Sequence, residues 1–186
     1  MLDSTSPPQV SESHCFQARL ARLVAAAGPL ATVEAEMTAR RRLLRLLADF
    51  AVDTAAHTDM PAFLREADPD GSYGVHCVHD DPAGWSLAAV VMTPGQQTPP
   101  HDHDSWGAAA TVMGVESNRR YRGTCPDQLT LFDEQLAPVG GGYLFAAGDI
   151  HQAACAAPST TVSLHLLVKG GPHAHQRCKE SPRTSG

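Results

Sequence analysis

Positive charge is scarce in this sequence. Lysine and arginine account for 14 of its 186 residues, against 20 aspartate and glutamate residues, so the formal net charge is −6. The basic residues are scattered along the chain, and therefore offer no basic patch to a phosphate backbone or an anionic membrane. We predict neither a nucleic-acid partner nor a membrane partner.

Long hydrophobic runs are missing as well. Uninterrupted apolar stretches such as 87–92 are far below the roughly 20 residues that a membrane-spanning helix requires. The segment 1–13 has no basic region followed by an apolar run, which is the pattern of a secretory signal. A cytoplasmic location is therefore expected.

Cysteine usage and chain length limit the architecture. The five cysteines lie at irregular spacings without a CxxC pair, which argues against a disulfide framework or a zinc knuckle. A chain of 186 residues can build one good core and is too short for two ordinary domains. We expect a single domain over 14–168, with a disordered N-terminus at 1–13 and a flexible tail at 169–186.

Two kinds of periodicity divide this domain. From Phe16 to about Asp53 apolar residues recur at helical spacing, interrupted at Gly28-Pro29, which predicts two helices with Thr32 as N-cap of the second. This helical part is expected to span 14–68. Beyond it, about eight short antiparallel strands predict a small barrel or jelly roll over 72–168. The expected strands are 73–79, 86–93, 108–113, 118–122, 129–136, 142–145, 151–155 and 160–168.

Three histidines are the strongest candidates for chemistry. His101 and His103 are two residues apart, and side chains at i and i+2 of a strand share a face, so both imidazoles can bind one ion. His151 follows a Gly148-Asp149 turn that leads into a predicted strand. The three residues together predict a metal site.

The two segments around these histidines resemble the paired motifs of the cupin superfamily. In the first motif a glycine and five further residues precede His-x-His, and in the second motif glycines precede the last histidine. The positions in register are Gly95, His101, His103, Gly114, Gly140, Gly148 and His151, whereas Ala146 and Cys155 replace the usual proline and asparagine. The resemblance implies a mainly β fold, the cupin double-stranded β-helix (jelly-roll barrel), with an N-terminal helical segment.

The glutamate that usually follows the first motif is absent. The window 104–108 holds only Asp104 as a carboxylate, one residue after His103 and therefore on the opposite face of a strand. Three neutral imidazoles leave a divalent ion its full charge and about three open positions, which suits an anionic donor such as a thiolate beside dioxygen. A closed structural zinc site would instead supply four protein ligands.

Residues flanking the histidines indicate which family within the cupin superfamily the sequence resembles. They are Pro94-Gly95, Thr98-Pro99, His101-Asp102-His103, Trp106-Gly107, Gly148-Asp149-Ile150-His151 and Ser163-Leu164-His165. In these segments the sequence resembles the thiol dioxygenases, the family of cysteine dioxygenase and 3-mercaptopropionate dioxygenase. The resemblance implies one ferrous ion, Fe(II), per chain, with nickel or zinc as alternatives in a purified sample. It also implies oxidation of a small-molecule thiol by dioxygen to a sulfinate, in a monomer or a homodimer.

The resemblance also assigns roles to residues outside the metal site. Ser163 and His165 are alternate residues of a strand and are expected to be catalytic groups near the metal. Trp106 is a candidate substrate contact, although packing at the barrel mouth is the simpler role.

Three departures from the family affect the substrate and the proton path. Val75 stands where cysteine-oxidising members carry an arginine that holds the substrate carboxylate, and Leu167 stands where the family has a tyrosine. Without that tyrosine, we expect His165 to orient against Ser163 alone or through a water. Arg177, ten residues beyond Leu167, is a candidate for the substrate-binding arginine of bacterial members.

Two other functions are compatible with the sequence. A different metal cupin, such as a ring-cleaving or diketone dioxygenase, would usually keep the first-motif glutamate. A non-catalytic cupin that senses or stores a small ligand would tend to lose the histidines, but the loss of the family arginine and tyrosine is consistent with it.

Overall fold

A computed structural model of the chain describes residues 15–32, 34–57, 59–62, 66, 72–123 and 128–168. The segments predicted to be disordered or flexible, 1–13 and 169–186, lie outside the described residues, and so does Arg177. The described residues form two helices followed by eight strands, which confirms the predicted mainly β fold class with an N-terminal helical segment. The elements are α1 (Phe16–Ala27), α2 (Met37–Ala55), β1 (Gly74–Asp81), β2 (Trp85–Met92), β3 (Gly107–Met113), β4 (Val115–Arg122), β5 (Thr130–Pro138), β6 (Gly142–Phe145), β7 (Ile150–Cys155) and β8 (Thr161–Val168).

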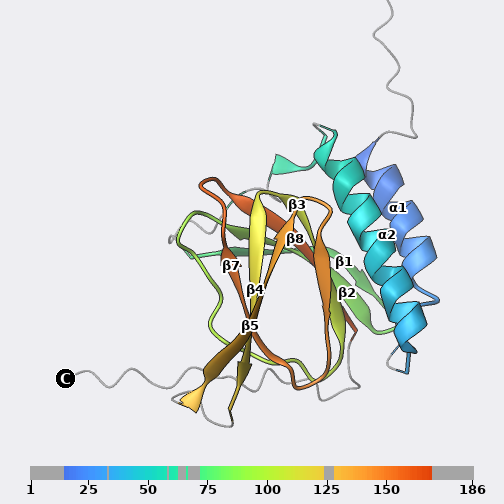
Figure 1. The fold of residues 1–186 in the computed structure, drawn as a ribbon. Coiled ribbons are helices and arrows are strands. Elements are labelled where there is room, and N and C mark those ends of the chain that lie inside the picture. The colour runs from blue at the N-terminus through green and yellow to red at the C-terminus, as the bar shows by residue number, and fades with distance from the viewer. Residues whose placement is uncertain are drawn as a thin grey trace, which may run out of the picture.

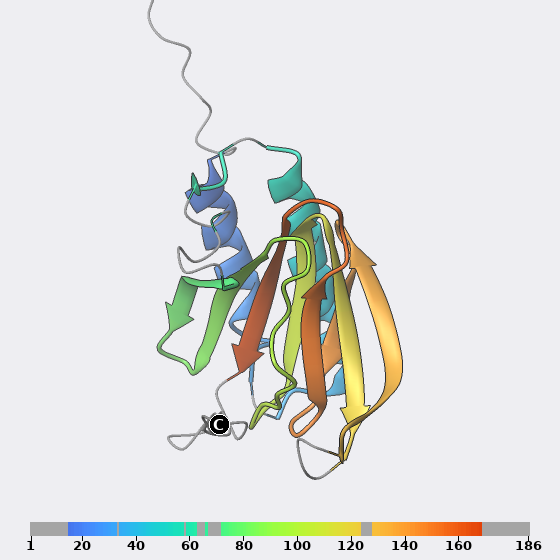
Figure 2. The same ribbon diagram turned by 90° about the vertical axis from the view of Figure 1, so that its left-hand side faces the viewer.

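The strands form two antiparallel sheets that face each other (Figures 1 and 2). The five-stranded sheet has the order β1-β2-β8-β3-β6, and the three-stranded sheet has the order β5-β4-β7. In Figure 1 both helices pack on the outer face of the five-stranded sheet. The three-stranded sheet covers the opposite, inner face, so that the space between the sheets is the interior of a barrel.

The alternation of strand β8 shows how the sequence separates the two faces. Its even-numbered residues, 162 to 168, belong to the apolar core that includes both helices. Successive side chains of a strand point to opposite faces, so the odd-numbered residues face the barrel interior. Ser163 and His165 are therefore interior residues, and both are buried.

Strand β4 begins earlier than the sequence predicts. It was expected from Asn118, but it starts at Val115 and includes Glu116 and Ser117, both of which are buried. Two polar residues shortly after Gly114 are typical of a turn, and only tertiary partners explain a buried carboxylate inside a strand. Those partners belong to the candidate site.

The connection between the helices holds Trp106 in the helix–sheet core. Helix α2 begins at Met37 with Glu36 at its N-cap, so the prediction of Thr32 as N-cap is wrong. The Thr32 carbonyl instead accepts a hydrogen bond of 2.9 Å from the Trp106 indole N–H, and the Arg40 guanidinium lies 4.9 Å from the centre of the Trp106 ring. Trp106 thus packs beneath the helices, and this position gives no support to a substrate contact.

Within the described part of the chain, neither helix is long and apolar enough to cross a membrane.

Candidate metal centre

His101 and His151 are held side by side by their own backbones. The His101 N–H donates to the His151 carbonyl at 2.9 Å, and the His151 N–H donates to the His101 carbonyl at 2.8 Å. This isolated antiparallel bridge joins the segment before β3 to the start of β7. Side chains of directly opposite residues lie on the same face, and the two imidazole centres are 4.6 Å apart.

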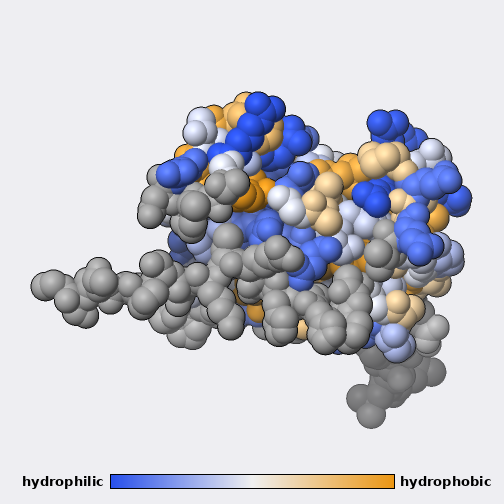
Figure 3. All heavy atoms as spheres, turned by 90° about the horizontal axis from the view of Figure 1, so that it is seen from below, coloured by the Kyte–Doolittle hydropathy of each residue, from blue (hydrophilic) through white to orange (hydrophobic). Residues whose placement is uncertain are grey.

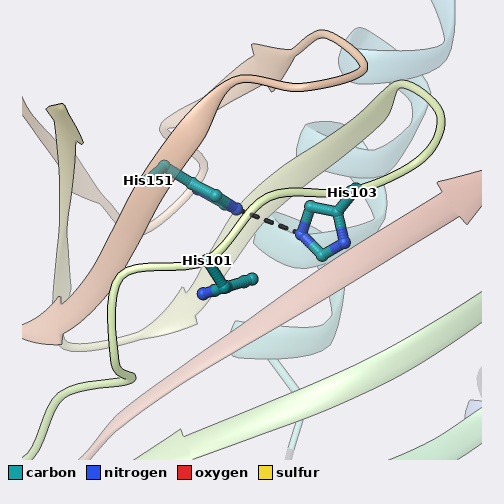
Figure 4. A group of neighbouring side chains, drawn as sticks. All are labelled: His101, His103 and His151. Atoms are coloured by element: carbon teal, nitrogen blue, oxygen red, sulfur yellow. Dashed lines mark hydrogen bonds between the residues drawn. The ribbon is translucent and has the colours of Figure 1, made fainter. Parts of the chain in front are cut away.

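His103 is brought to this pair by the turn that precedes β7. The Gly148 N–H donates to the His103 carbonyl at 2.9 Å, and Gly148 has a φ of +75°, a backbone conformation that a side chain would strain. The Nε2 atoms of His103 and His151 are 3.1 Å apart, as the dashed line in Figure 4 marks. The motif glycine therefore positions one ligand and precedes another.

The Nδ1 atoms of two of these rings are already engaged. The Nδ1–H of His101 donates to the Pro99 carbonyl at 2.9 Å, and the Nδ1–H of His151 donates to the Asn118 Oδ1 at 3.1 Å. Because both partners can only accept, the Nε2 of each neutral ring carries the lone pair that a metal needs. In the metal-free protein the His103 Nε2–H can donate to the His151 Nε2.

The three rings fit a single divalent ion. One ligand nitrogen from each of His101, His103 and His151 lies within 4.8 Å of the others. Two ligands at about 2.1 Å from one ion are roughly 3.0–3.4 Å apart at common coordination angles, which matches the His103–His151 separation. Among the described residues, no carboxylate or thiol joins this group. A metal could be held here by three neutral imidazoles.

Burial keeps these imidazoles neutral. Removal from water lowers the pKa of His103 to about 4 and that of His151 to about 2, and the neighbouring histidine charges act in the same direction. Burial likewise lowers the pKa of His101, against a smaller opposing effect of the Pro99 carbonyl. At neutral pH all three rings can therefore donate lone pairs without first releasing a proton to solvent.

An aromatic wall closes one side of the site. The Phe145 ring stacks on His151 with centres 4.8 Å apart and lies 4.9 Å from the centre of His103. Gly107 makes this possible, because a Cβ there would overlap the Phe145 ring and lie 2.7 Å from the Leu166 carbonyl oxygen. Phe145 thus packs an apolar ring against two of the three imidazoles.

Beside the three histidines lies a buried polar cluster centred on Glu116. The Tyr143 hydroxyl donates to Glu116 Oε1 at 2.6 Å, the Ser163 hydroxyl donates to Oε2, and the His165 Nε2 lies 3.2 Å from the same Oε2. The Glu116 side chain has no solvent exposure. The expectation that His165 would orient against Ser163 alone is therefore wrong, because the carboxylate shares that role.

The cluster keeps Glu116 ionised in spite of its burial. Burial alone raises the pKa of Glu116, but the His165 charge and the hydrogen bonds from His165, Ser163 and Tyr143 together hold that pKa below its ordinary value. Burial and the adjacent carboxylate raise the pKa of Tyr143 well above 10.0, so the phenol stays a neutral donor. A buried carboxylate with these partners is satisfied.

The geometry differs from that of a nucleophilic serine triad. Such a triad needs one imidazole nitrogen on serine and the other on the carboxylate. Here the single atom His165 Nε2 lies 3.0 Å from Ser163 Oγ and 3.2 Å from Glu116, and the serine hydroxyl donates to the carboxylate. The cluster therefore orients His165 and does not activate Ser163 for attack.

The structure also places Leu167 and Val75, the two positions at which the sequence departs from the motifs it resembles. Leu167 packs against the interior apolar cluster of Ala109, Ala137, Tyr143 and Phe145. Val75 lies on the edge strand β1 and is 57% exposed.

Sequence reasoning missed three residues of the site: Glu116, Asn118 and Tyr143. The spacing of Glu116 and Asn118, two residues apart on β4, places both on the interior face, but this signal is visible only once the strand is known to start at Val115. Tyr143 occupies the second motif and resembles an ordinary strand residue. The candidate residues Ser163 and His165 do lie in the same barrel interior as the histidines.

Comparisons with known proteins support the fold. No family model matches the chain, and no curated protein matches its sequence. Among solved structures, an uncharacterized conserved protein with a double-stranded β-helix domain from Klebsiella pneumoniae is similar over 64% of this chain and 97% of its own, with 12% identity and a TM-score of 0.50. A cupin family protein from Methanocaldococcus jannaschii is similar over 56% of this chain and 87% of its own, with 10% identity and a TM-score of 0.43. Oxalate oxidase is similar over 62% of each chain, with 16% identity and a TM-score of 0.48.

At these identities the likeness concerns the fold alone. Together with the two facing antiparallel sheets, the likeness to the double-stranded β-helix domain shows that the chain has the predicted double-stranded β-helix (jelly-roll) fold.

Metal binding should depend on all three histidines. Replacing His101, His103 or His151 by alanine is expected to weaken binding of a divalent ion by more than about 100-fold, since loss of an orienting partner alone costs about 10–100-fold. Asn118→Ala should weaken metal binding by about 10–100-fold, because it removes the hydrogen-bond partner that orients the His151 ring. The measurement is competition titration with zinc, with His76→Ala on β1 as the matched control. Equal affinity in His103→Ala and His76→Ala would contradict the assignment.

The metal-free protein should lose stability when it is acidified through the histidine range. The unfolded chain takes up protons below about 6.5, whereas His103 and His151 in the folded chain do so only near 4 and 2. The free energy of unfolding therefore falls as the pH is lowered from about 6.5 towards 4. Urea denaturation at several pH values with a chelator tests this, and His103→Gln should flatten the dependence. An unchanged dependence in that variant would show that His103 is not held neutral by the fold.

Proposed function

We propose that this protein is an iron-dependent thiol dioxygenase that oxidises a small thiol to its sulfinate. The observation that carries the proposal is the ligand set, three neutral imidazoles with no carboxylate among the described residues of the group. Such a set leaves the full charge of a divalent ion and about three open positions to exogenous ligands. A ferrous ion held by His101, His103 and His151 would supply the electron-transfer chemistry that lets dioxygen react with a thiolate.

The overall reaction adds both atoms of dioxygen to the sulfur atom. The thiol loses its S–H proton, two S–O bonds form, and the O–O bond breaks, so the sulfur is oxidised and the dioxygen is reduced without another reductant. What the protein must do is accept that proton, exclude water and hold the thiol. The Phe145 ring against His103 and His151 provides an apolar wall for water exclusion.

We propose that the buried cluster centred on Glu116 accepts the thiol proton and orients the groups of the site. The His165 imidazole contacts both Ser163 and Glu116 through Nε2, and its charge is felt by all three ligand histidines. His165 is thus placed to accept the thiol proton, and the Glu116 carboxylate, 3.2 Å from its Nε2, would stabilise the ring that has accepted it. Ser163 then acts by fixing the ring, and Tyr143 by fixing the carboxylate.

A second candidate is a metal-binding cupin that binds a small ligand without oxidising it. Leu167 favours this alternative, because its side chain packs on Tyr143 and Phe145 where the thiol dioxygenases have a hydroxyl. The Glu116 carboxylate and the Tyr143 hydroxyl still supply other polar groups in the barrel interior. For this reason we prefer the dioxygenase to the ligand-binding protein.

Oxygen consumption by the iron-loaded protein tests the proposal directly. We expect uptake with 3-mercaptopropionate, cysteine or cysteamine, and one dioxygen consumed for each sulfinate detected by mass spectrometry. Catechols and diketones should cause no uptake, because the site favours a soft anionic donor. Tight metal binding with no uptake for any thiol would leave the ligand-binding alternative in its place.

Variants of the buried cluster test its role separately. His165→Ala and Glu116→Gln should keep the iron content and lower turnover by about 10–1000-fold, the usual range for acid–base groups and their supports. Leu164→Ala is the matched control, because Leu164 lies on the same strand and faces the helices. It should lower stability but leave the turnover per iron unchanged. Loss of iron in His165→Ala would show that His165 is a metal ligand. Unchanged turnover in His165→Ala and Glu116→Gln would show that the cluster contributes only to packing.

A further inference from the structure

Apolar packing closes the barrel along β5 and β6. The buried residues of this cluster are Ala109, Ala137, Tyr143 and Phe145. The end of the barrel where β2 stops is closed as well, because Val90 and Met92 pack there with Ala153 of β7. Within the described part of the chain, two routes to the three histidines remain, one from the β1–β2 side and one from the opposite end of the barrel.

On the β1–β2 side, the interior face of the five-stranded sheet extends into solvent. Cys77 of β1 pairs with Ala88 of β2, and Ala88 pairs with His165 of β8. Directly opposite residues of antiparallel strands project from the same face, so all three belong to the face that carries His165. Along this row the side chain is exposed at Cys77, half-buried at Ala88 and 8% exposed at His165. Solvent therefore reaches this face from the β1 edge inwards as far as Ala88.

The two neighbouring rows show how far the exposed part of this face extends. Val75 is 57% exposed, but its partner Val90 on β2 is buried. Ser86 is half-buried, and so is its partner Leu167 on β8. Solvent thus reaches deepest along β2 at Ser86 and Ala88.

The facing sheet presents a candidate metal ligand on this same side. Its strand order leaves one edge of β7 free, and the segment 97–101 pairs with that edge: the Thr98 N–H donates to the Ala153 carbonyl at 2.8 Å, and His101 pairs with His151. His101 therefore lies on the outermost segment of this sheet, and it is half-buried. Figure 2 shows the segment between β2 and β3 on the side of the barrel that faces the viewer, with the β1–β2 hairpin to its left.

The opposite end of the barrel offers the competing route. A cavity of about 330 Å³ lies at the end of β4, and Arg122, Phe132 and Gly148 are among its lining residues. Figure 3 views the molecule from the end where β4 stops in Figure 2, and the described side chains there are interspersed hydrophilic and hydrophobic groups. The described lining of this cavity includes none of the three histidines. The Arg122 guanidinium also covers the Phe132 ring, 4.3 Å from its centre. These features favour the β1–β2 side.

We propose that ligands of the metal centre enter from the β1–β2 side, between Ala88 and His101, and that the small Ala88 side chain sets the size of the ligand that can pass. Ala88 has the smallest side chain on this face of β2, and it lies directly opposite His165. A larger side chain there would project into the route, here called the side passage. Ala88 is thus a specificity-determining residue for small, compact ligands. That the ligand is a thiol rests on the proposed function, whereas the side passage rests on the metal centre alone.

Ligand association with the cobalt-loaded full-length protein tests the side passage without any oxidation. Cobalt(II) absorption reports ligand binding in stopped-flow mixing, with azide as the small probe and benzenethiol as the bulky probe. Ala88→Phe should slow benzenethiol association by roughly tenfold or more and azide association by less than about threefold, because restricted access lowers the association rate more for the larger ligand. Cys77→Trp, at the exposed outer end of the row, should act in the same direction. Because Cys77 is exposed, this variant keeps the test informative if Ala88→Phe does not fold.

Ala88→Ser and Arg122→Trp are the matched controls. The first keeps the side chain small, and the second fills the cavity at the end of β4 with a large ring. Both should bind azide and benzenethiol at the rates of the unchanged protein. Slower benzenethiol association in Arg122→Trp than in Ala88→Phe and Cys77→Trp would place the entrance at the end of β4 and overturn the side passage. Rates that no variant changes, or that all variants change alike, would overturn it as well.

Oxygen uptake by the iron-loaded protein separates this inference from the proposed function. The expected changes in association rate, with no thiol oxidised, would refute the dioxygenase and keep the side passage. Thiol oxidation, with benzenethiol association unchanged in Ala88→Phe and Cys77→Trp, would refute the side passage and keep the dioxygenase. A protein that binds no cobalt would refute the metal centre and the side passage with it.

Discussion

The two backbone hydrogen bonds between His101 and His151 are the constraint on which the site depends. They are the contact that fixes a ligand from the loop before β3 against a ligand from β7. His103 follows from the first of these residues by chain spacing, and it is fixed in turn by the Gly148 N–H. Backbone contacts between two segments far apart in sequence thus fix the positions of the three histidines. Their side chains then supply the chemistry of the site.

The barrel fold also places polar groups in an interior that would otherwise be apolar. On β8 the alternation of leucine or valine with serine and histidine sends Leu164 and Leu166 to the helices and Ser163 and His165 to the interior. Burying a carboxylate such as Glu116 is costly unless every oxygen is satisfied, and three donors converge on it here. A cluster with this much desolvated polarity beside three imidazoles is typical of a reactive site rather than of a structural core.

Most of the fold could be predicted from the sequence because its periodicities are clear. Eight strands and two helices follow from apolar alternation and from the glycine and proline breaks, and the His-x-His spacing with His151 identifies the group of three histidines that could hold a metal. The start of β4 could not be predicted, since Glu116 and Ser117 look like turn residues until Ser163, Tyr143 and His165 are known to surround the carboxylate. Trp106 was ambiguous for a similar reason, because its partner Thr32 is 74 residues away.

The central claim is that three imidazoles and no other protein group hold the metal, with room for a thiolate. X-ray absorption spectroscopy of the iron-loaded protein tests it most directly. The account predicts imidazole scattering from three rings at about 2.0–2.3 Å with light atoms completing the shell, and a new sulfur scatterer at about 2.3 Å when 3-mercaptopropionate is added. A sulfur or bidentate carboxylate signal in the thiol-free protein, or a spectrum that a thiol leaves unchanged, would contradict it.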